Sequence, residues 1–88
     1  MAHMLAKLTG VDFSSVEQKL AADAPGYAEQ GMQLEHLWRN AGDPNEVLFL
    51  FRVEDLDHCK RLMERVESEA RLRDPHAKRP ETIFLDGQ

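Results

Sequence analysis

Three aromatic side chains, His36, Trp38 and Tyr27, are the residues of this sequence best suited to hold or transform a small molecule. His36 and Trp38 stand two positions apart in a stretch with the alternating pattern of a β-strand, so both project from one face. An imidazole titrates near neutral pH, so His36 can act as a general base or bond to a substrate oxygen. Trp38 can stack on a flat ligand, and Tyr27 can offer its hydroxyl at a pocket mouth.

Each of these residues also has a purely structural interpretation, which is the commoner use of its type. A histidine on an apolar face is usually bonded to a backbone group, and a strand tryptophan is usually the largest filler of a core. Tyr27 near the end of the first helix suits a purely structural position at the rim equally well. We keep His36 as the candidate catalytic residue, and His36, Trp38 and Tyr27 as the candidate ligand-binding residues.

The sequence lacks the spacing patterns of metal and nucleotide sites. It contains no CxxC, HxxxH or HExxH pattern, so we expect no metal. Neither GxGxxG nor GxxxxGK[ST] occurs, and we expect no cofactor. Cys59 is the only cysteine and cannot form an internal disulfide, which fits a reducing cytoplasm.

Length and charge limit the classes of function. Eighty-eight residues form one domain. We interpret residues 1–4 as a tag remnant followed by the native start, which gives His3 no role, and residues 5–88 as a single ferredoxin-like domain. The formal net charge of −5 argues against binding to nucleic acid or to an anionic membrane. No stretch approaches the roughly 20 apolar residues of a membrane span, and the N-terminus lacks the features of a signal peptide. We therefore expect a cytoplasmic protein.

The stretch 32–53 predicts two antiparallel strands joined by a turn. The segment 43–46, Asp-Pro-Asn-Glu, has the composition of a type I turn. The apolar run at 47–51 is rich in strand formers and is typical of a strand covered on both faces.

The pairing of these strands decides which side chains share a face. If Gly42 pairs with Val47, Trp38 lies opposite Phe51, and His36 joins them on the face that carries the helices. The other face is then semi-apolar and has no aromatic residue, which an RNA-recognition domain would need. It suits a contact between subunits better than bare solvent, and it consists of Glu35, Leu37, Arg39, Leu48, Leu50 and Arg52.

The rest of the chain supplies two helices and two more strands. A strand is predicted at 4–9, a helix begins near residue 12 and is ended or kinked by Pro25-Gly26, a second helix follows residue 53, and a last strand lies at 81–85. The order β-α-β-β-α-β points to a ferredoxin-like sandwich, an α+β fold with a four-stranded antiparallel sheet and both helices on one face. Its open apolar face predicts a homodimer formed through that face.

The second helix has a narrow apolar stripe. Cys59 lies in this stripe and is interpreted as a small buried hydrophobic residue. Its other sides carry opposite charges four residues apart, such as Lys60 and Glu64, which indicates a solvated surface. The stripe consists of Leu56, Cys59, Met63, Val66 and Ala70.

A family resemblance is carried by three segments. They are Arg-Asn-Ala-Gly-Asp-Pro-Asn-Glu-Val-Leu-Phe-Leu-Phe at 39–51, Glu-Asp-Leu at 54–56, and Pro-Glu-Thr-Ile-Phe-Leu at 80–85. The chain resembles small stand-alone dimeric α/β-barrel proteins similar to the antibiotic-biosynthesis monooxygenase superfamily. The resemblance implies a homodimer whose two sheets form a barrel, with a crevice between sheet and helices. Members with known activity are mostly cofactor-independent oxygenases, isomerases or haem-related enzymes, so it also allows a haem ligated by His36 or His76.

Two functional hypotheses follow. The first is a homodimer that binds a small molecule between sheet and helices, with cofactor-independent monooxygenase-like activity as its enzymatic form. The alternative is a ligand-sensing or protein-interaction module without a catalytic site, in which His36 and Trp38 are structural. A cavity that touches His36 would favour the first.

Overall fold

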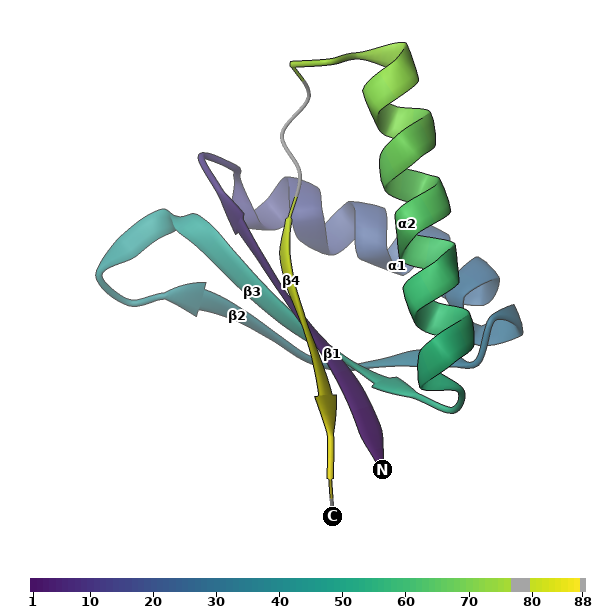
Figure 1. Ribbon diagram of the computed structural model, residues 1–88. Coiled ribbons are helices and arrows are strands. Elements are labelled where there is room, and N and C mark those ends of the chain that lie inside the picture. Colours follow the sequence, from purple (N-terminus) through teal and green to yellow (C-terminus); the bar gives the residue numbers. More distant parts are fainter. Residues whose placement is uncertain (77–79, 88) are drawn as a thin grey trace.

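The computed structural model describes residues 1–76 and 80–87 and folds them into a four-stranded sheet with two helices (Figure 1). The strand order is β2-β3-β1-β4, and all neighbouring strands are antiparallel. Both helices contribute buried residues to one core, so they cover one face of the sheet and leave the other open. The predicted ferredoxin-like fold class is confirmed. The elements are β1 (Ala2–Thr9), α1 (Phe13–Glu29), β2 (Met32–Asn40), β3 (Asp43–Val53), α2 (Leu56–Arg73) and β4 (Glu81–Asp86).

Strand β1 begins earlier than predicted. Ala2 pairs with Val53, and Met4, which is buried, pairs with Phe51. Nε2 of His3 lies 2.8 Å from a carboxylate oxygen of Glu35 on β2. Residues 2–4 therefore extend the central strand, and His3 has a partner that the sequence did not indicate.

Local side-chain contacts set the ends of α1. Asp12 caps its N-terminus, because its carboxylate accepts a hydrogen bond of 3.0 Å from the backbone N–H of Ser15. The helix continues through Pro25 to Glu29, so Pro25 does not end it. Gly31 then adopts a φ of +76°, which favours glycine, and leads the chain into β2.

Helix α2 is capped by Asp55, whose carboxylate accepts a hydrogen bond of 3.1 Å from the backbone N–H of His58. Only its N-terminal part reaches the core, where Cys59 is fully buried. Farther along the predicted stripe, Val66 is 46% exposed. The helix thus leaves the sheet as it proceeds. No helix in the described ranges is long and apolar enough to cross a membrane.

The hairpin turn lies earlier than predicted. Asn40 pairs with Asp43, so the turn consists of residues 41 and 42, and the segment 43–46 belongs to β3. The Asn40 side-chain oxygen accepts a hydrogen bond of 2.8 Å from the backbone N–H of Gly42, which closes the turn. Asp43 accepts a similar bond of 3.0 Å from the N–H of Asn45. The prediction of a type I turn at 43–46 is wrong, because both Asx residues bond locally and the first of them makes the turn.

The pairing of β2 with β3 also differs from the prediction. Trp38 pairs with Leu48 rather than Phe51, and His36 pairs with Leu50. The register shifts twice, between Arg39 and Asn40 and between Leu34 and His36. Relative to the predicted pairing, Trp38 is shifted by three positions, and a shift by an odd number moves every side chain of the shifted segment to the opposite face of the sheet. His36 and Trp38 therefore lie on the open face, whereas Phe51 lies under the helices.

Candidate functional site

A cleft of about 940 Å³ opens between α1, α2 and the covered face of the sheet. This volume lies at the upper end of the range for small-molecule pockets, about 300–1,000 Å³. Its floor is formed by β1, β3 and β4, and part of that floor belongs to the hydrophobic core. The cleft therefore reaches the centre of the protein. The floor residues are Met4, Ala6, Leu8, Phe49, Phe51, Thr82 and Phe84.

The two helices form the walls of the cleft. Helix α1 contributes Val16, Leu20 and Tyr27, and α2 contributes Met63 and Val66 from its apolar stripe. The cleft exists because only the N-terminal part of this stripe packs against the core, where Cys59 is buried, whereas Val66 farther along is 46% exposed. The wall is therefore apolar at depth.

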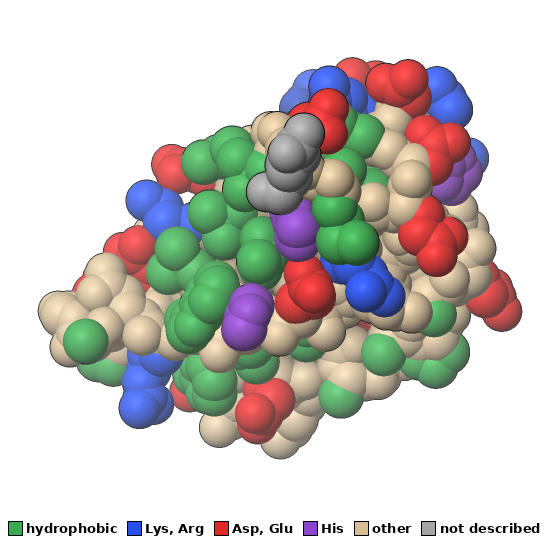
Figure 2. All heavy atoms as spheres, turned by 90° about the horizontal axis from the view of Figure 1, so that it is seen from below, with side chains coloured by type: hydrophobic (Ala, Val, Ile, Leu, Met, Phe, Trp, Pro, Cys, Tyr) green, Lys and Arg blue, Asp and Glu red, His purple; other side chains and the backbone are tan. Residues whose placement is uncertain are grey.

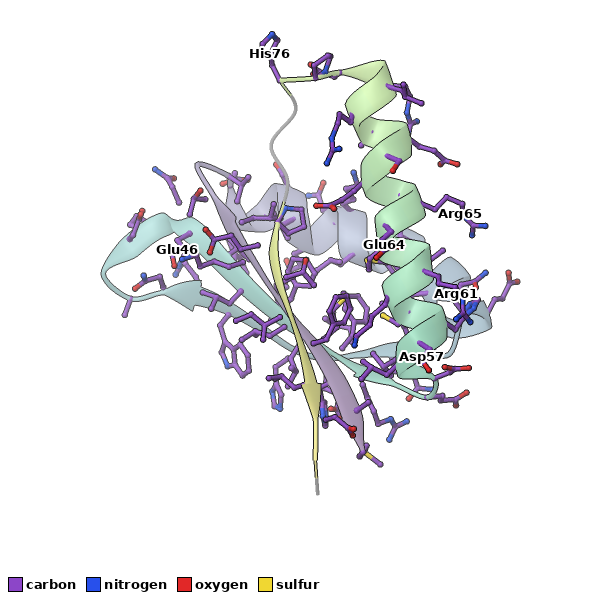
Figure 3. All side chains as sticks on the ribbon, viewed as in Figure 1. Glu46, Asp57, Arg61, Glu64, Arg65 and His76 are labelled. Carbon is purple, nitrogen blue, oxygen red and sulfur yellow. The ribbon has the colours of Figure 1, made fainter. Side chains whose placement is uncertain are left out.

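Charged side chains surround the mouth of the cleft. Lys60 and Glu64 line it and are both exposed, as the prediction of a solvated surface requires. Figure 3 shows Glu64 on the side of α2 that faces the gap toward the sheet, whereas Asp57, Arg61 and Arg65 point away. The ammonium group of Lys60 lies 5.7 Å from the centre of the Phe84 ring. The charged residues of the lining are Lys19, Asp23, Lys60, Glu64 and Glu67.

Tyr27 is the predicted ligand-binding residue that the structure places in the cleft. Its ring centre lies 4.9 Å from that of Phe51, with the planes tilted by 53°. Burial, and to a lesser extent the negative charge of Asp23, raises the pKa of the Tyr27 hydroxyl. The phenol therefore stays protonated at neutral pH and can donate a hydrogen bond to a ligand oxygen.

His36 and Trp38 lie on the other side of the sheet. The prediction that they face the helices and a pocket between them is wrong, because the register places them opposite Leu50 and Leu48. Neither residue lines either of the two cavities described here. Their rings are stacked, with centres 4.8 Å apart and planes 11° apart. Whether they bind a ligand stays a prediction, but they cannot do so in this cleft.

His58 and His76 lie away from the cleft floor as well. Nε2 of His58 lies 2.6 Å from the side-chain oxygen of Gln30, and this contact joins the start of α2 to the end of α1. Figure 3 shows His76 beyond the C-terminal end of α2. No histidine is among the residues that line the cleft in the described ranges. His36 and His76, which the family resemblance allows as haem ligands, therefore do not line this cleft.

The open face of the sheet carries a second apolar feature, here called the open-face patch. Figure 2, which views the molecule from below, shows hydrophobic side chains gathered beside histidine side chains. Within the patch, Trp38 is 45% exposed and Ile83 is 54% exposed. The strand pairings place six residues in it: Leu5, Trp38, Leu48, Leu50, Ile83 and Leu85.

Ion pairs border the open-face patch. Lys7 lies 3.4 Å from Glu81 and 3.8 Å from Glu46, and Arg52 bonds to Gln33. The prediction that this face lacks aromatic residues is wrong, since Trp38 lies on it. Trp38, however, belongs to the edge strand β2, and aliphatic residues occupy the central strands. The arrangement therefore does not offer the central stacking platform of an RNA-recognition domain.

The comparisons with known proteins concern the fold. No protein-family model matches the sequence, and no curated protein matches it. The structure is similar to the crystal structure of an uncharacterised NIPSNAP domain protein from Burkholderia xenovorans, with a TM-score of 0.58 and 18% sequence identity. The similarity covers 100% of this chain and 95% of that chain. The chain is therefore a small α+β domain with a NIPSNAP-like fold, built on the ferredoxin-like topology.

Proposed function

We propose that this protein binds an apolar small molecule in the cleft between the sheet and its two helices. The observation that carries the proposal is that apolar side chains lining the cleft remain partly exposed: Tyr27, Met63 and Phe84 are half-buried, and Val66 is 46% exposed. A folded domain of this size usually closes its helices over such residues. A bound ligand would complete the core, and each Å² of apolar surface removed from water would contribute about 25 cal/mol.

The lining favours a ligand with a large apolar body and one polar end. Aromatic rings from Tyr27, Phe49, Phe51 and Phe84 surround the deep part, which suits a flat or ring-containing body. The protonated hydroxyl of Tyr27 is a donor for a carbonyl or hydroxyl oxygen of that ligand. It makes no hydrogen bond to another residue in the described ranges.

The enzymatic form of the proposal is a cofactor-independent, monooxygenase-like reaction. Its support is the fold alone, through the family resemblance. His36 has no part in it, because this residue lies on the far side of the sheet. Any proton transfer in the cleft falls to the titratable groups of its lining, which are Tyr27, Lys19, Asp23, Lys60, Glu64 and Glu67. Ligand binding without catalysis is the form that the geometry supports best.

We also propose that two copies associate through the open-face patch. The support is the exposure of apolar side chains on this face, where Leu85 is 41% exposed in addition to Trp38 and Ile83. A short chain buries only about 60–65% of its unfolded surface and gains from such a contact. In a two-fold dimer the same patch meets itself, so its apolar centre would pair with an identical centre.

A fluorescent probe tests the cleft directly. 1-Anilinonaphthalene-8-sulfonate should bind the protein, and Gly26→Trp should weaken this binding at least tenfold. Gly26 lines the cleft, and a side chain added there meets open space within 4 Å, so it can extend into the ligand volume. The matched control is Ala21→Trp, at an exposed position on the same helix that does not line the cleft.

The probe result has a clear interpretation. Weaker binding in Gly26→Trp with unchanged binding in Ala21→Trp supports a ligand site in the cleft. Equal affinities in both variants would exclude this cleft as the site. A thermal-shift screen of metabolites on the same two variants then identifies ligands, because a molecule bound only to the native state raises its stability.

The dimer has its own test. Ile83→Glu places a charge in the open-face patch, and sedimentation velocity should show conversion to monomers. Leu72→Glu is the control, because Leu72 lies on α2 and is 86% exposed. A wild-type protein that sediments as a monomer at micromolar concentration would refute the dimer, and so would an unchanged dimer in Ile83→Glu.

A further inference from the structure

Three side chains of the cleft floor lie in one row across the sheet. Met4 on β1 pairs with Phe51 of β3 on one side and with Phe84 of β4 on the other. Neighbouring strands lie about 4.8 Å apart, so the two phenylalanines are separated by roughly 10 Å. All three side chains line the cleft. This row, here called the floor row, therefore crosses all three strands that form the floor.

A polar side chain stands over each end of the floor row. At one end, the ring centre of Tyr27 on α1 lies 4.9 Å from that of Phe51. At the other end, the ammonium group of Lys60 on α2 lies 5.7 Å from the ring centre of Phe84. Both Tyr27 and Lys60 line the cleft. A molecule that lies along the floor row would thus meet a phenol at one end and a positive charge at the other.

We propose that the cleft binds a flat carboxylic acid along the floor row, with its carboxylate at Lys60 and a hydroxyl or carbonyl oxygen at Tyr27. The inference rests on the small-molecule site proposed above and names its ligand class. A lysine ammonium donates charge-assisted hydrogen bonds to a carboxylate, whereas a phenol donates to a neutral oxygen. The flat body of the ligand would lie between the rings of Phe51 and Phe84, which suits an aromatic or conjugated acid.

The charges on the two helices decide which end takes the carboxylate. Asp23 lies one turn before Tyr27 on α1 and also lines the cleft. Its negative charge repels an anion at the Tyr27 end; burial and, to a lesser extent, this same charge raise the pKa of the phenol. In the described ranges no carboxylate oxygen lies within 4.0 Å of the Lys60 ammonium group. The charge of Lys60 is therefore available to a ligand.

The remaining charged side chains of the lining lie away from the floor row. Glu64 and Glu67 follow Lys60 by one and two turns of α2, toward the part of the helix that leaves the sheet. Lys19 precedes Tyr27 by eight residues of α1, which is about 12 Å along the helix axis. Lys19 therefore offers a matched control, because it carries the same charge in the same lining at a distance from the row.

Displacement of 1-anilinonaphthalene-8-sulfonate by 6-hydroxy-2-naphthoate tests the proposal. This compound carries a hydroxyl and a carboxylate at opposite ends of a flat ring system. It should displace the dye about tenfold more strongly than 6-hydroxy-2-naphthamide, which lacks the charge, because a charge-assisted hydrogen bond is the stronger one. The preference should disappear in Lys60→Met and persist in Lys19→Met, and both lysines are exposed, so neither change threatens the fold.

The phenol contact has its own comparison. Tyr27→Phe should weaken the binding of 6-hydroxy-2-naphthoate but leave that of 2-naphthoate, which lacks the hydroxyl, unchanged. An equal loss for both compounds would mean that Tyr27 only shapes the cleft, and it would overturn the assignment of the ligand oxygen to this residue.

The outcomes separate this inference from the ligand site on which it rests. If the acid and the amide displace the dye equally from the wild-type protein, or if Lys60→Met keeps the preference, the inference is overturned and the cleft remains a ligand site. The same holds if neither naphthalene compound displaces a dye whose binding Gly26→Trp weakens. Dye binding that Gly26→Trp leaves unchanged would remove both the site and the inference.

Discussion

Replacing Gly31 by alanine perturbs the joint at which α1 ends and β2 begins. Gly31 has a φ of +76°, in the left-handed region, and its carbonyl accepts a hydrogen bond of 2.9 Å from the backbone N–H of Glu54. A Cβ at this position would lie 3.3 Å from Cβ of Glu54 and 3.2 Å from its Oε2. The side chain would therefore meet both an unfavourable backbone conformation and a close neighbour.

The expected magnitude comes mainly from the backbone. For a residue with a Cβ, the left-handed backbone conformation costs about 1–2 kcal/mol of free energy. The Glu54 carboxylate is exposed and can rotate away, so the remaining contact with its Cβ adds a smaller amount. We expect the free energy of unfolding to fall by about 1–2 kcal/mol. For a domain of this size, Tm should fall by roughly 4–8 °C for each kcal/mol.

The matched control is Gly26→Ala, which should raise the free energy of unfolding rather than lower it. Gly26 lies inside α1, and an added Cβ there meets nothing within 4 Å. Alanine in a helix is about 0.8–1 kcal/mol more favourable than glycine, so this variant should be more stable than the wild type. Urea unfolding followed by circular dichroism measures both, with the m-value as a check on two-state behaviour. A Gly31→Ala variant as stable as the wild type would refute the described joint between α1 and β2.

Three further outcomes follow from the structure. Burial raises the pKa of Tyr27 in the folded state, so its contribution to stability is complete below about pH 10, the pKa of an unperturbed tyrosine, and is lost as the pH rises above it. Between pH 8 and 11, the free energy of unfolding measured in urea should therefore decline less in Tyr27→Phe than in the wild type. Met32→Ala should lose about 2–5 kcal/mol of unfolding free energy, because Met32 is fully buried, whereas Met1→Ala should be neutral by the same assay, since Met1 is 69% exposed. His36→Ala should leave probe binding in the cleft unchanged, and fluorescence titration showing a large loss of affinity would contradict the register of β2.

The elements and their order were predictable because their signals are local. An aspartate that precedes an apolar periodic segment caps each helix: Asp12 caps α1, and Asp55 caps α2. The apolar run at 47–51 is rich in strand formers, which predicted a strand, and it lies within β3. Six elements in this order leave few ways to form one antiparallel sheet, so the fold class followed from them.

The faces of the hairpin were not predictable, because two turn sites compete within a few residues. Asn40 through Asp43 and Asp43 through Glu46 both contain the residues of a tight turn. The structure uses the first, and two register shifts follow along β2, one between Arg39 and Asn40 and one between Leu34 and His36. Because side chains alternate along a strand, a small displacement was enough to move His36 and Trp38 from the expected cleft to the open face.

The cleft and the contacts of Cys59 Sγ with the sulfur atoms of Met4 and Met32, each 3.8 Å, depend on distances between elements. The spacing of the α2 stripe predicts an apolar face but not how far that face stands from the sheet, so the placement of Lys60 and Glu64 at the cleft mouth could not be foreseen. Met4, Met32 and Cys59 are far apart in sequence, and no spacing pattern connects them.

The sequence by itself determined where each helix and strand lies and that one face of the sheet would be left open, because capping, periodicity and charge act over a few neighbouring residues. Only the tertiary structure decided which side chains share a face, how far α2 stands from the sheet, and which sulfur atoms meet. Those features depend on strand register and on packing between distant segments, where a change of a few residues or ångströms alters the chemistry of the site.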